Sequence, residues 1–153
     1  MVRTNFETLR IYRLSEFLAD EIWIVANGWK PFARDTIGKQ VVRAADSIGA
    51  NIAEGSGRGS PQDNRRFIRM ARGSLYETQH WLRRAFKRKL LTTRQVGELK
   101  PLIDELAPKI NSYLHAVSKT VARQTTRPPR NVKDRKPKIK DQKEQPRSHA
   151  AAA

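Results

Sequence analysis

Basic residues along one predicted helix have the types and the spacing to bind a polyanion. Arg65, Arg69 and Arg72 follow one another at intervals of four and three residues, which places them on one helix face. Clustered arginine suits phosphate because its planar fork grips two oxygens, and the interleaved Tyr76 can stack on a base. We predict a nucleic-acid-binding set made of Arg58, Arg65, Arg66, Arg69, Arg72, Tyr76, Arg83, Arg84, Lys87 and Arg88. The alternative is a solvated helix face, or arginines that pair with acids of neighbouring subunits.

A second polar set is predicted to be structural rather than chemical. Its members recur at helical spacing beside a stripe of apolar and small residues, so a neighbouring backbone can approach closely and partly enclose them. Enclosed polar groups need partners. We expect Glu54 or Glu77 to pair with Arg43, and Asn51 to bridge backbone groups. The predicted network consists of Gln40, Arg43, Ser47, Asn51, Glu54 and Glu77.

Two other patterns resemble functional motifs, and we predict that neither is one. The glycines at 55, 57 and 59 resemble a phosphate-cradling loop, but no predicted strand precedes them, so a helix stop and a tight reversal are favoured. An adventitious phosphate contact through Arg58 stays open. Glu77 and His80 form a single Glu-x-x-His, which di-iron bundles use twice. We therefore predict no catalytic residue, no metal, no cofactor and no enzyme activity.

The charge of the chain points to a polyanionic partner. Among 153 residues, 31 are Lys or Arg and 15 are Asp or Glu, a net charge of +16. Residues 123–153 alone carry ten basic and three acidic residues, so the excess lies in the body as well as in this segment. Nucleic acid is the commonest polyanion for such a surface, although a basic surface can also serve solubility alone.

The chain carries no signal of secretion or of a membrane. It contains no cysteine, which excludes a disulfide framework and a thiolate metal site. The longest apolar run, residues 22–26, is far too short to span a bilayer, and the first 14 residues lack the apolar block of a signal peptide. We predict a cytoplasmic protein with no membrane partner.

Apolar residues at intervals of three and four predict an all-α fold with four helices. The predicted helices cover residues 14–27, 37–54, 61–89 and 93–122. Ser60 is the expected N-cap of the third, followed by Pro61, and Thr92 with Gln95 forms a capping box before the fourth. Residues 30–36 are expected to be a loop.

Three expectations concern the remaining segments. Pro101 and Pro108 fall inside the fourth helix, so we expect a kink or a later helix start. Trp23 and Trp29 are assigned to the core or a subunit contact rather than to a base-stacking platform, since each lies within or just beyond an apolar stripe. Residues 1–122 form the predicted domain, and residues 123–153 form a disordered basic tail because they have almost nothing to bury.

The stretch 37–82 resembles the bacterial 23S ribosomal RNA intervening-sequence protein family. The residues that carry the resemblance are Gln40, Arg43-Ala44-Ala45, Ser47-Ile48, Ala50, Asn51-Ile52-Ala53-Glu54-Gly55, Gly57-Arg58, Phe67 and Ala71-Arg72-Gly73-Ser74-Leu75-Tyr76-Glu77. The match covers about 45 contiguous residues, which makes it a strong family signal.

The resemblance implies an antiparallel up-down four-helix bundle that assembles into a ring, typically a homopentamer. It also implies kinship with accessory proteins of diversity-generating retroelements, whose bundles bind nucleic acid and a reverse transcriptase. It implies no catalytic residue. The alternative is a structural protein–protein interaction scaffold with no nucleic-acid role.

Overall fold

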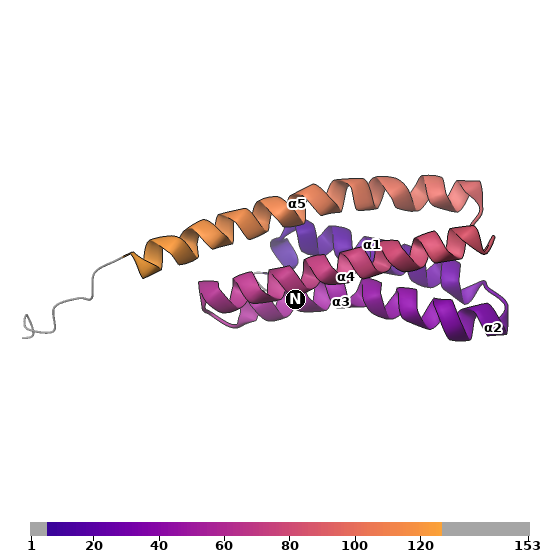
Figure 1. The fold of residues 1–153 in the computed structure, drawn as a ribbon, viewed down its shortest axis with the longest axis horizontal. Coiled ribbons are helices and arrows are strands. Elements are labelled where there is room, and N and C mark those ends of the chain that lie inside the picture. Colours follow the sequence, from indigo (N-terminus) through magenta and orange to yellow (C-terminus); the bar gives the residue numbers. More distant parts are fainter. Residues whose placement is uncertain (1–5, 127–153) are drawn as a thin grey trace, which may run out of the picture.

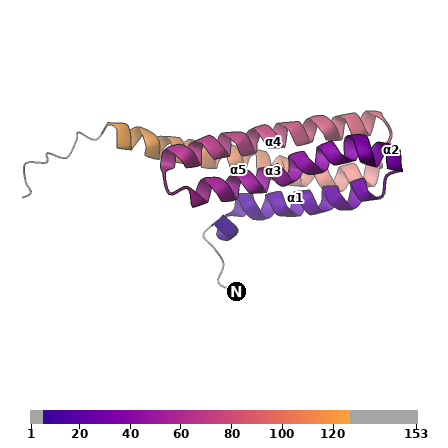
Figure 2. The same ribbon diagram turned by 90° about the horizontal axis from the view of Figure 1, so that it is seen from below.

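The computed structural model describes residues 6–126, which form an all-α bundle of four long helices. The helices are α1 (Arg10–Asn27), α3 (Lys39–Gly57), α4 (Pro61–Lys87) and α5 (Thr93–Thr125). Consecutive long helices run in opposite directions, and α5 extends beyond the end of the other three (Figures 1 and 2). The predicted fold class is confirmed. The expected disordered tail lies outside the described residues from 127 onward, and α5 continues three residues past the predicted domain end.

The core of the bundle is the apolar stripe of each helix. The spacing of three and four residues places these side chains on one face, and each fully buried Leu, Ile or Val stabilises the fold by about 1.5–3 kcal/mol. The largest fully buried apolar side chains are Leu18, Ile22, Val41, Ile48, Ile52, Ile68, Leu75, Leu106 and Ile110. Met70 and Phe86 on α4 lie outside this core and are 46% and 56% exposed.

Small residues bring α3 and α4 close together. A Cβ on Gly55 would lie 2.8 Å from the Cβ of Phe67 and 3.0 Å from Oδ1 of Asn64. Gly55 is therefore a packing residue inside α3, which continues to Gly57 rather than stopping at residue 54. The reversal falls at Gly59, whose φ of +72° is in the left-handed region that glycine adopts most readily.

Both predicted helix caps are confirmed. Ser60 Oγ accepts a hydrogen bond from the Asp63 N–H at 3.1 Å, and Pro61 occupies the first turn of α4. At the start of α5, Thr92 Oγ1 accepts from the Gln95 N–H at 3.2 Å, while Gln95 Oε1 accepts from the Thr92 N–H at 2.9 Å. These bonds satisfy backbone donors that a helix start would otherwise leave unpaired.

The segment predicted as a loop is helical. After Lys30 the chain forms α2 (Pro31–Ala33) and then η2 (Arg34–Gly38), a π-helical turn that leads into α3 without a break. Pro31 favours this start because its fixed φ suits the first helical position. Buried Ile37 then anchors the turn, at 3% exposure.

The prolines in α5 do not delay its start. The helix is continuous from Thr93 to Thr125 with Pro101 and Pro108 inside it, and it curves gently along its length (Figure 1). Both prolines are exposed, as are Gly97 and Asp104 four residues before them. The carbonyls that lose their helical donors therefore face water, which can replace the missing bonds.

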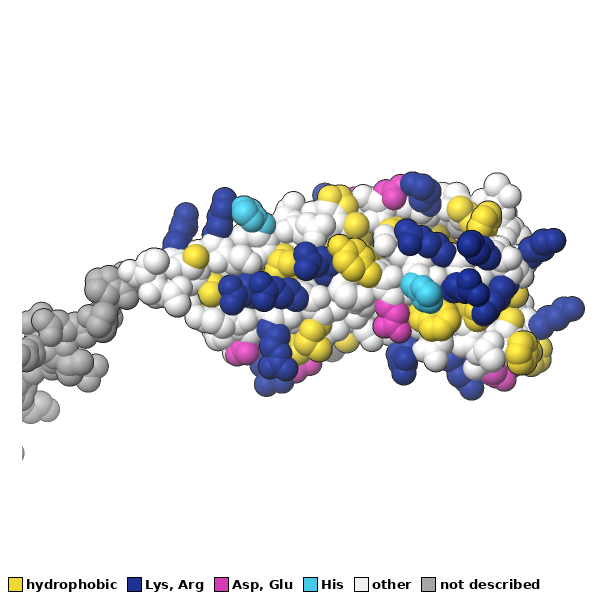
Figure 3. Space-filling model, viewed as in Figure 1, with side chains coloured by type: hydrophobic (Ala, Val, Ile, Leu, Met, Phe, Trp, Pro, Cys, Tyr) yellow, Lys and Arg dark blue, Asp and Glu magenta, His cyan; other side chains and the backbone are white. Residues whose placement is uncertain are grey.

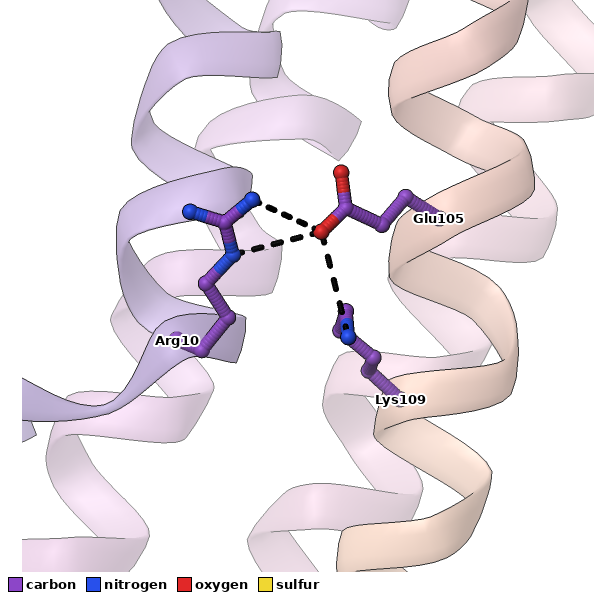
Figure 4. A network of polar contacts seen from close by, with 3 residues as sticks. All are labelled: Arg10, Glu105 and Lys109. Carbon is purple, nitrogen blue, oxygen red and sulfur yellow. Dashed lines mark hydrogen bonds and ion pairs between the residues drawn. The ribbon is translucent and has the colours of Figure 1, made fainter.

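A polar contact links the first and last helices. Arg10 on α1 donates from Nε and Nη2 to Oε1 of Glu105 on α5, at 3.2 and 2.8 Å, and Lys109 Nζ lies 3.8 Å from the same oxygen (Figure 4). All three of its side chains are more than a third exposed, so its contribution to stability is modest. Within residues 6–126, no helix has the length and apolar character needed to cross a membrane.

Candidate nucleic-acid interface

The predicted nucleic-acid-binding residues on α4 lie on the face that points away from the core. The apolar stripe of the helix, from Phe67 to Ala85, is buried, which turns the arginine stripe outward. Tyr76 is 54% exposed in the middle of this stripe. The exposed cations of the set are Arg58, Arg66, Arg69, Arg83, Lys87 and Arg88, and the half-buried ones are Arg65, Arg72 and Arg84.

The cations of α4 have no acidic partner among residues 6–126. Every ion pair found there involves a cation on another segment: Arg10, Lys39, Arg58, Arg94, Lys100 and Lys109. On α4 itself, Arg72 Nη1 lies 3.5 Å from Oδ1 of Asn111, and the Arg66 guanidinium lies 5.7 Å from the ring centre of Phe67. Neither contact neutralises the charge, so the stripe keeps its positive field.

Arg58 differs from the rest of the set because it is already partnered. Its Nη2 donates to Glu54 one helical turn back, and its guanidinium lies 5.4 Å from the ring centre of Phe67. The hydrogen bond to Glu54, followed by the charge of that carboxylate, raises the pKa of Arg58 above its usual value. A phosphate at this position would have to compete with Glu54.

The positive charge forms two groups along α4. Lys and Arg side chains gather over each end of the helix in Figure 3. In sequence the first group spans residues 65–72 and the second residues 83–88, separated by Tyr76, Glu77 and His80. The stripe from Arg65 to Lys87 measures about 33 Å at 1.5 Å per residue, long enough for several successive phosphates of one strand.

The polar stripe on α3 forms a chain of local bonds. Arg43 Nη2 donates to Gln40 Oε1 at 2.9 Å, and Ser47 Oγ donates to the Arg43 carbonyl at 2.7 Å. Asn51 Nδ2 then donates to the Ser47 carbonyl at 2.7 Å. The stripe is not enclosed within one chain, since Arg43 is exposed and the others are half-buried.

The expected pairing of Arg43 with Glu54 or Glu77 does not occur within the chain. Glu54 lies eleven residues away, about 16 Å along the helix, and bonds to Arg58 instead. Glu77 Oε1 accepts from Trp81 Nε1 at 3.4 Å. In both cases a partner one turn away on the same helix is nearer than Arg43. A structural role for the stripe stays a prediction.

The other motifs behave as local structure. Of the three glycines, only Gly59 makes the reversal, while Gly55 and Gly57 belong to α3, so the expected helix stop at Gly55 is wrong. Across the described part of the chain, no three potential metal ligands come together, so Glu77 and His80 remain an isolated pair.

A groove that no sequence pattern predicted lies between α1 and α3. It has a volume of about 610 Å³, and Trp23, which was assigned to the core or a subunit contact, stands at its edge 60% exposed. The helical spacing did indicate that Trp23 is exposed. Trp23 directly follows Ile22 of the apolar stripe and is therefore rotated about 100° away from that stripe. Trp29, by contrast, packs half-buried against the core.

Residues 7–112 match the 23S rRNA-intervening sequence protein family, and this chain belongs to that family. A solved structure with a similar fold is a protein of unknown function from the S23 ribosomal protein family of Bacteroides thetaiotaomicron. The two chains share 23% identity with a TM-score of 0.63, and the similarity covers 69% of this chain and 95% of the other. No curated protein matches the sequence.

Proposed function

We propose that this protein is a non-catalytic, cytoplasmic nucleic-acid-binding protein that holds RNA or DNA through phosphate contacts on the outer face of α4. The observation that carries the proposal is the set of cations on α4 with no acidic partner among the described residues. Phosphate contacts of this kind give affinity without reading the sequence. The family name, which refers to an insertion in ribosomal RNA, is consistent with such a partner.

The proposal includes assembly of several copies into a ring, with five subunits as the expected number. Phe17, Ile24 and Met70 are 53%, 64% and 46% exposed on the single chain, and large exposed apolar side chains often mark protein contacts. A ring would present several copies of the α4 stripe to one strand and raise the overall affinity. A reverse transcriptase or another nucleic-acid enzyme is the proposed protein partner.

The second candidate is a structural scaffold that binds other proteins and has no nucleic-acid role. The same exposed apolar residues favour it, and the basic surface would then serve solubility. The two candidates differ in what the arginines do, so the test is made on them.

Binding of a single-stranded RNA and of a duplex DNA to the full-length protein separates the candidates. Arg69→Ala combined with Arg83→Ala removes one cation from each group on α4. We expect this variant to bind both nucleic acids more weakly, by a similar factor for every sequence. Arg94→Ala is the matched control, since Arg94 lies on α5 and is already paired with Glu98 at 2.8 Å. Equal binding by all three proteins, or no binding at low salt, would favour the scaffold.

A further inference from the structure

The groove between α1 and α3 has walls that suit a flat aromatic ligand. It is formed by α1, η2 and α3 and includes no residue of α4. Small residues keep it open: Ala26 and Gly38 line its floor, and neither carries a side chain that could fill it. The Trp23 indole stands at its edge with 60% of its surface exposed. An exposed indole beside an open apolar floor can stack on a ring that enters from solvent.

Polar groups without partners converge on the same groove. Arg34 and Asp46 both line it, and neither side chain has a hydrogen bond or ion pair among residues 6–126. The Asn27 amide is also free of partners in that part of the chain. Lys39 pairs only loosely with Asp35, at 3.5 Å and with both side chains more than half exposed. The groove thus offers donors, acceptors and positive charge that the fold itself does not use.

The backbone at this site is unusual as well. Arg34 to Gly38 form a π-helical turn, and such turns occur often at functional sites because they redirect side chains. The turn places Arg34 and Asp35 along the groove as well. Apolar walls with a few convergent polar groups are the usual composition of a small-ligand site.

We propose that this groove takes an unpaired nucleobase of a bound single strand, stacked on the Trp23 indole with its neighbouring phosphate on Arg34 and Lys39. The inference rests on the proposed nucleic-acid binding and deepens it, because it names the form of the strand. A paired base in a duplex cannot reach the indole, so single strands bind better than duplexes of equal charge.

The groove also selects among bases. A carboxylate accepts hydrogen bonds and donates none, so the free Asp46 side chain suits a base that presents donors. Guanine presents its ring N–H and its amino group side by side, which matches both carboxylate oxygens, whereas adenine presents an amino group beside an acceptor. Guanine is therefore the preferred base at this position.

The test compares a short single-stranded RNA of mixed sequence with a strand of equal length in which every base is replaced by an abasic sugar. Both strands carry the same phosphates, so the full-length protein should bind both through α4. Stacking adds affinity only for the strand with bases, by about 5- to 100-fold. Trp23→Ala should abolish this difference while binding of the abasic strand stays unchanged, and Trp23→Phe should keep part of it.

Phe32→Ala is the matched control, because Phe32 is an aromatic residue of α2, is 84% exposed and does not line the groove. It should keep the full preference for bases. Asp46→Asn should reduce the preference for guanine-rich over adenine-rich strands of equal length, a ratio in which the shared phosphate contacts cancel.

The outcomes separate this inference from the function on which it rests. If the parent binds both strands equally, or if Trp23→Ala retains the preference, the base site is wrong while phosphate binding stands. If neither strand binds at low salt, the proposed function is wrong, and the base site, which depends on it, is wrong too. If Trp23→Ala changes the mass of the native particle, a second copy covers the indole, and the base site is likewise excluded.

Discussion

At the scale of single residues, the contact between Arg10 and Glu105 makes a pH-dependent contribution to stability. The hydrogen bond from Arg10 lowers the pKa of Glu105 below its ordinary value of 4.5, and burial opposes this only in part. A carboxyl group with a depressed pKa in the folded state stabilises the fold above its unfolded pKa. That stability is lost as the pH falls through the folded value.

We predict that Glu105→Gln lowers the melting temperature at pH 7, and that the difference from the parent disappears below the ordinary pKa of 4.5. Thermal unfolding followed by circular dichroism across this pH range measures the effect. Glu98→Gln is the control, because the Arg94–Glu98 pair lies within one helix and joins no two elements. A difference that persists in acid would show that Glu105 acts through packing rather than charge.

The pKa of Asp46 is shifted in the opposite direction to that of Glu105. Burial, and next the charge of Asp20, raise its pKa above the ordinary value of 3.8. The folded protein therefore binds this proton more tightly than the unfolded chain, and ionised Asp46 opposes folding at neutral pH. We predict that Asp46→Asn raises the melting temperature at pH 7. This gain should shrink as the pH falls through the raised pKa of Asp46, and it should vanish below the ordinary pKa of 3.8. No gain at pH 7 would contradict this account.

At the scale of the elements, glycines in two helices should respond to the same substitution with opposite signs. Gly55→Ala places a Cβ 2.8 Å from Phe67, so α3 and α4 must separate, and we expect a loss of about 1–3 kcal/mol in the free energy of unfolding. Gly73→Ala on α4 meets nothing within 4 Å and removes a flexible residue from a helix, so we expect a gain of about 0.5–1 kcal/mol.

Denaturant unfolding of the two variants beside the parent measures both changes. A loss for Gly73→Ala would mean that another chain covers that surface. No loss for Gly55→Ala would mean that the two helices are not held as closely as the structure shows.

The elements also show what sequence patterns could predict and where they could not. The four helices and both caps followed from apolar spacing and from Ser60 and Thr92, because those signals act within one or two turns. The segment 30–36 was expected to be a loop because Pro31 breaks a helix that precedes it, yet the same residue starts the next one well. Gly55 was taken as a helix stop, since close packing against Phe67 depends on a distant residue.

The candidate site was predictable to a similar degree. The arginines of α4 were expected on one face, and the burial of the opposite face places them there. Their lack of acidic partners could not be known in advance, because it depends on where α3 and α5 place their carboxylates. The predicted pairing of Glu54 with Arg43 was wrong for a related reason. Glu54 accepts a hydrogen bond from Arg58, which lies one turn away on the same helix and is nearer than Arg43.

At the scale of the whole molecule, the polar stripe bears on assembly. Gln40, Arg43, Ser47 and Asn51 are bonded to one another but not enclosed within the single chain. A neighbouring subunit would supply the enclosure, and an enclosed polar group that loses its partner is strongly destabilising.

We predict that Arg43→Ala and Glu54→Ala each weaken the proposed oligomer. Analytical ultracentrifugation over a dilution series would then show dissociation at higher protein concentration than for the parent. Lys100→Ala on α5 is the control, since its pair with Asp104 is exposed and lies within one helix. Variants that melt and sediment like the parent would exclude a role for the stripe in assembly.

The central claim is that unpartnered cations on α4 hold a nucleic acid by its phosphates. The most direct measurement is the affinity of the full-length protein for a single-stranded RNA as a function of salt concentration. We predict tight binding at low salt, and a fall in the logarithm of affinity with the logarithm of salt by about 0.7 for each phosphate contacted. Each α4 arginine replaced by alanine should reduce that slope by the amount that corresponds to about one phosphate contact. No binding at low salt, or a slope that the α4 variants leave unchanged, would contradict the account.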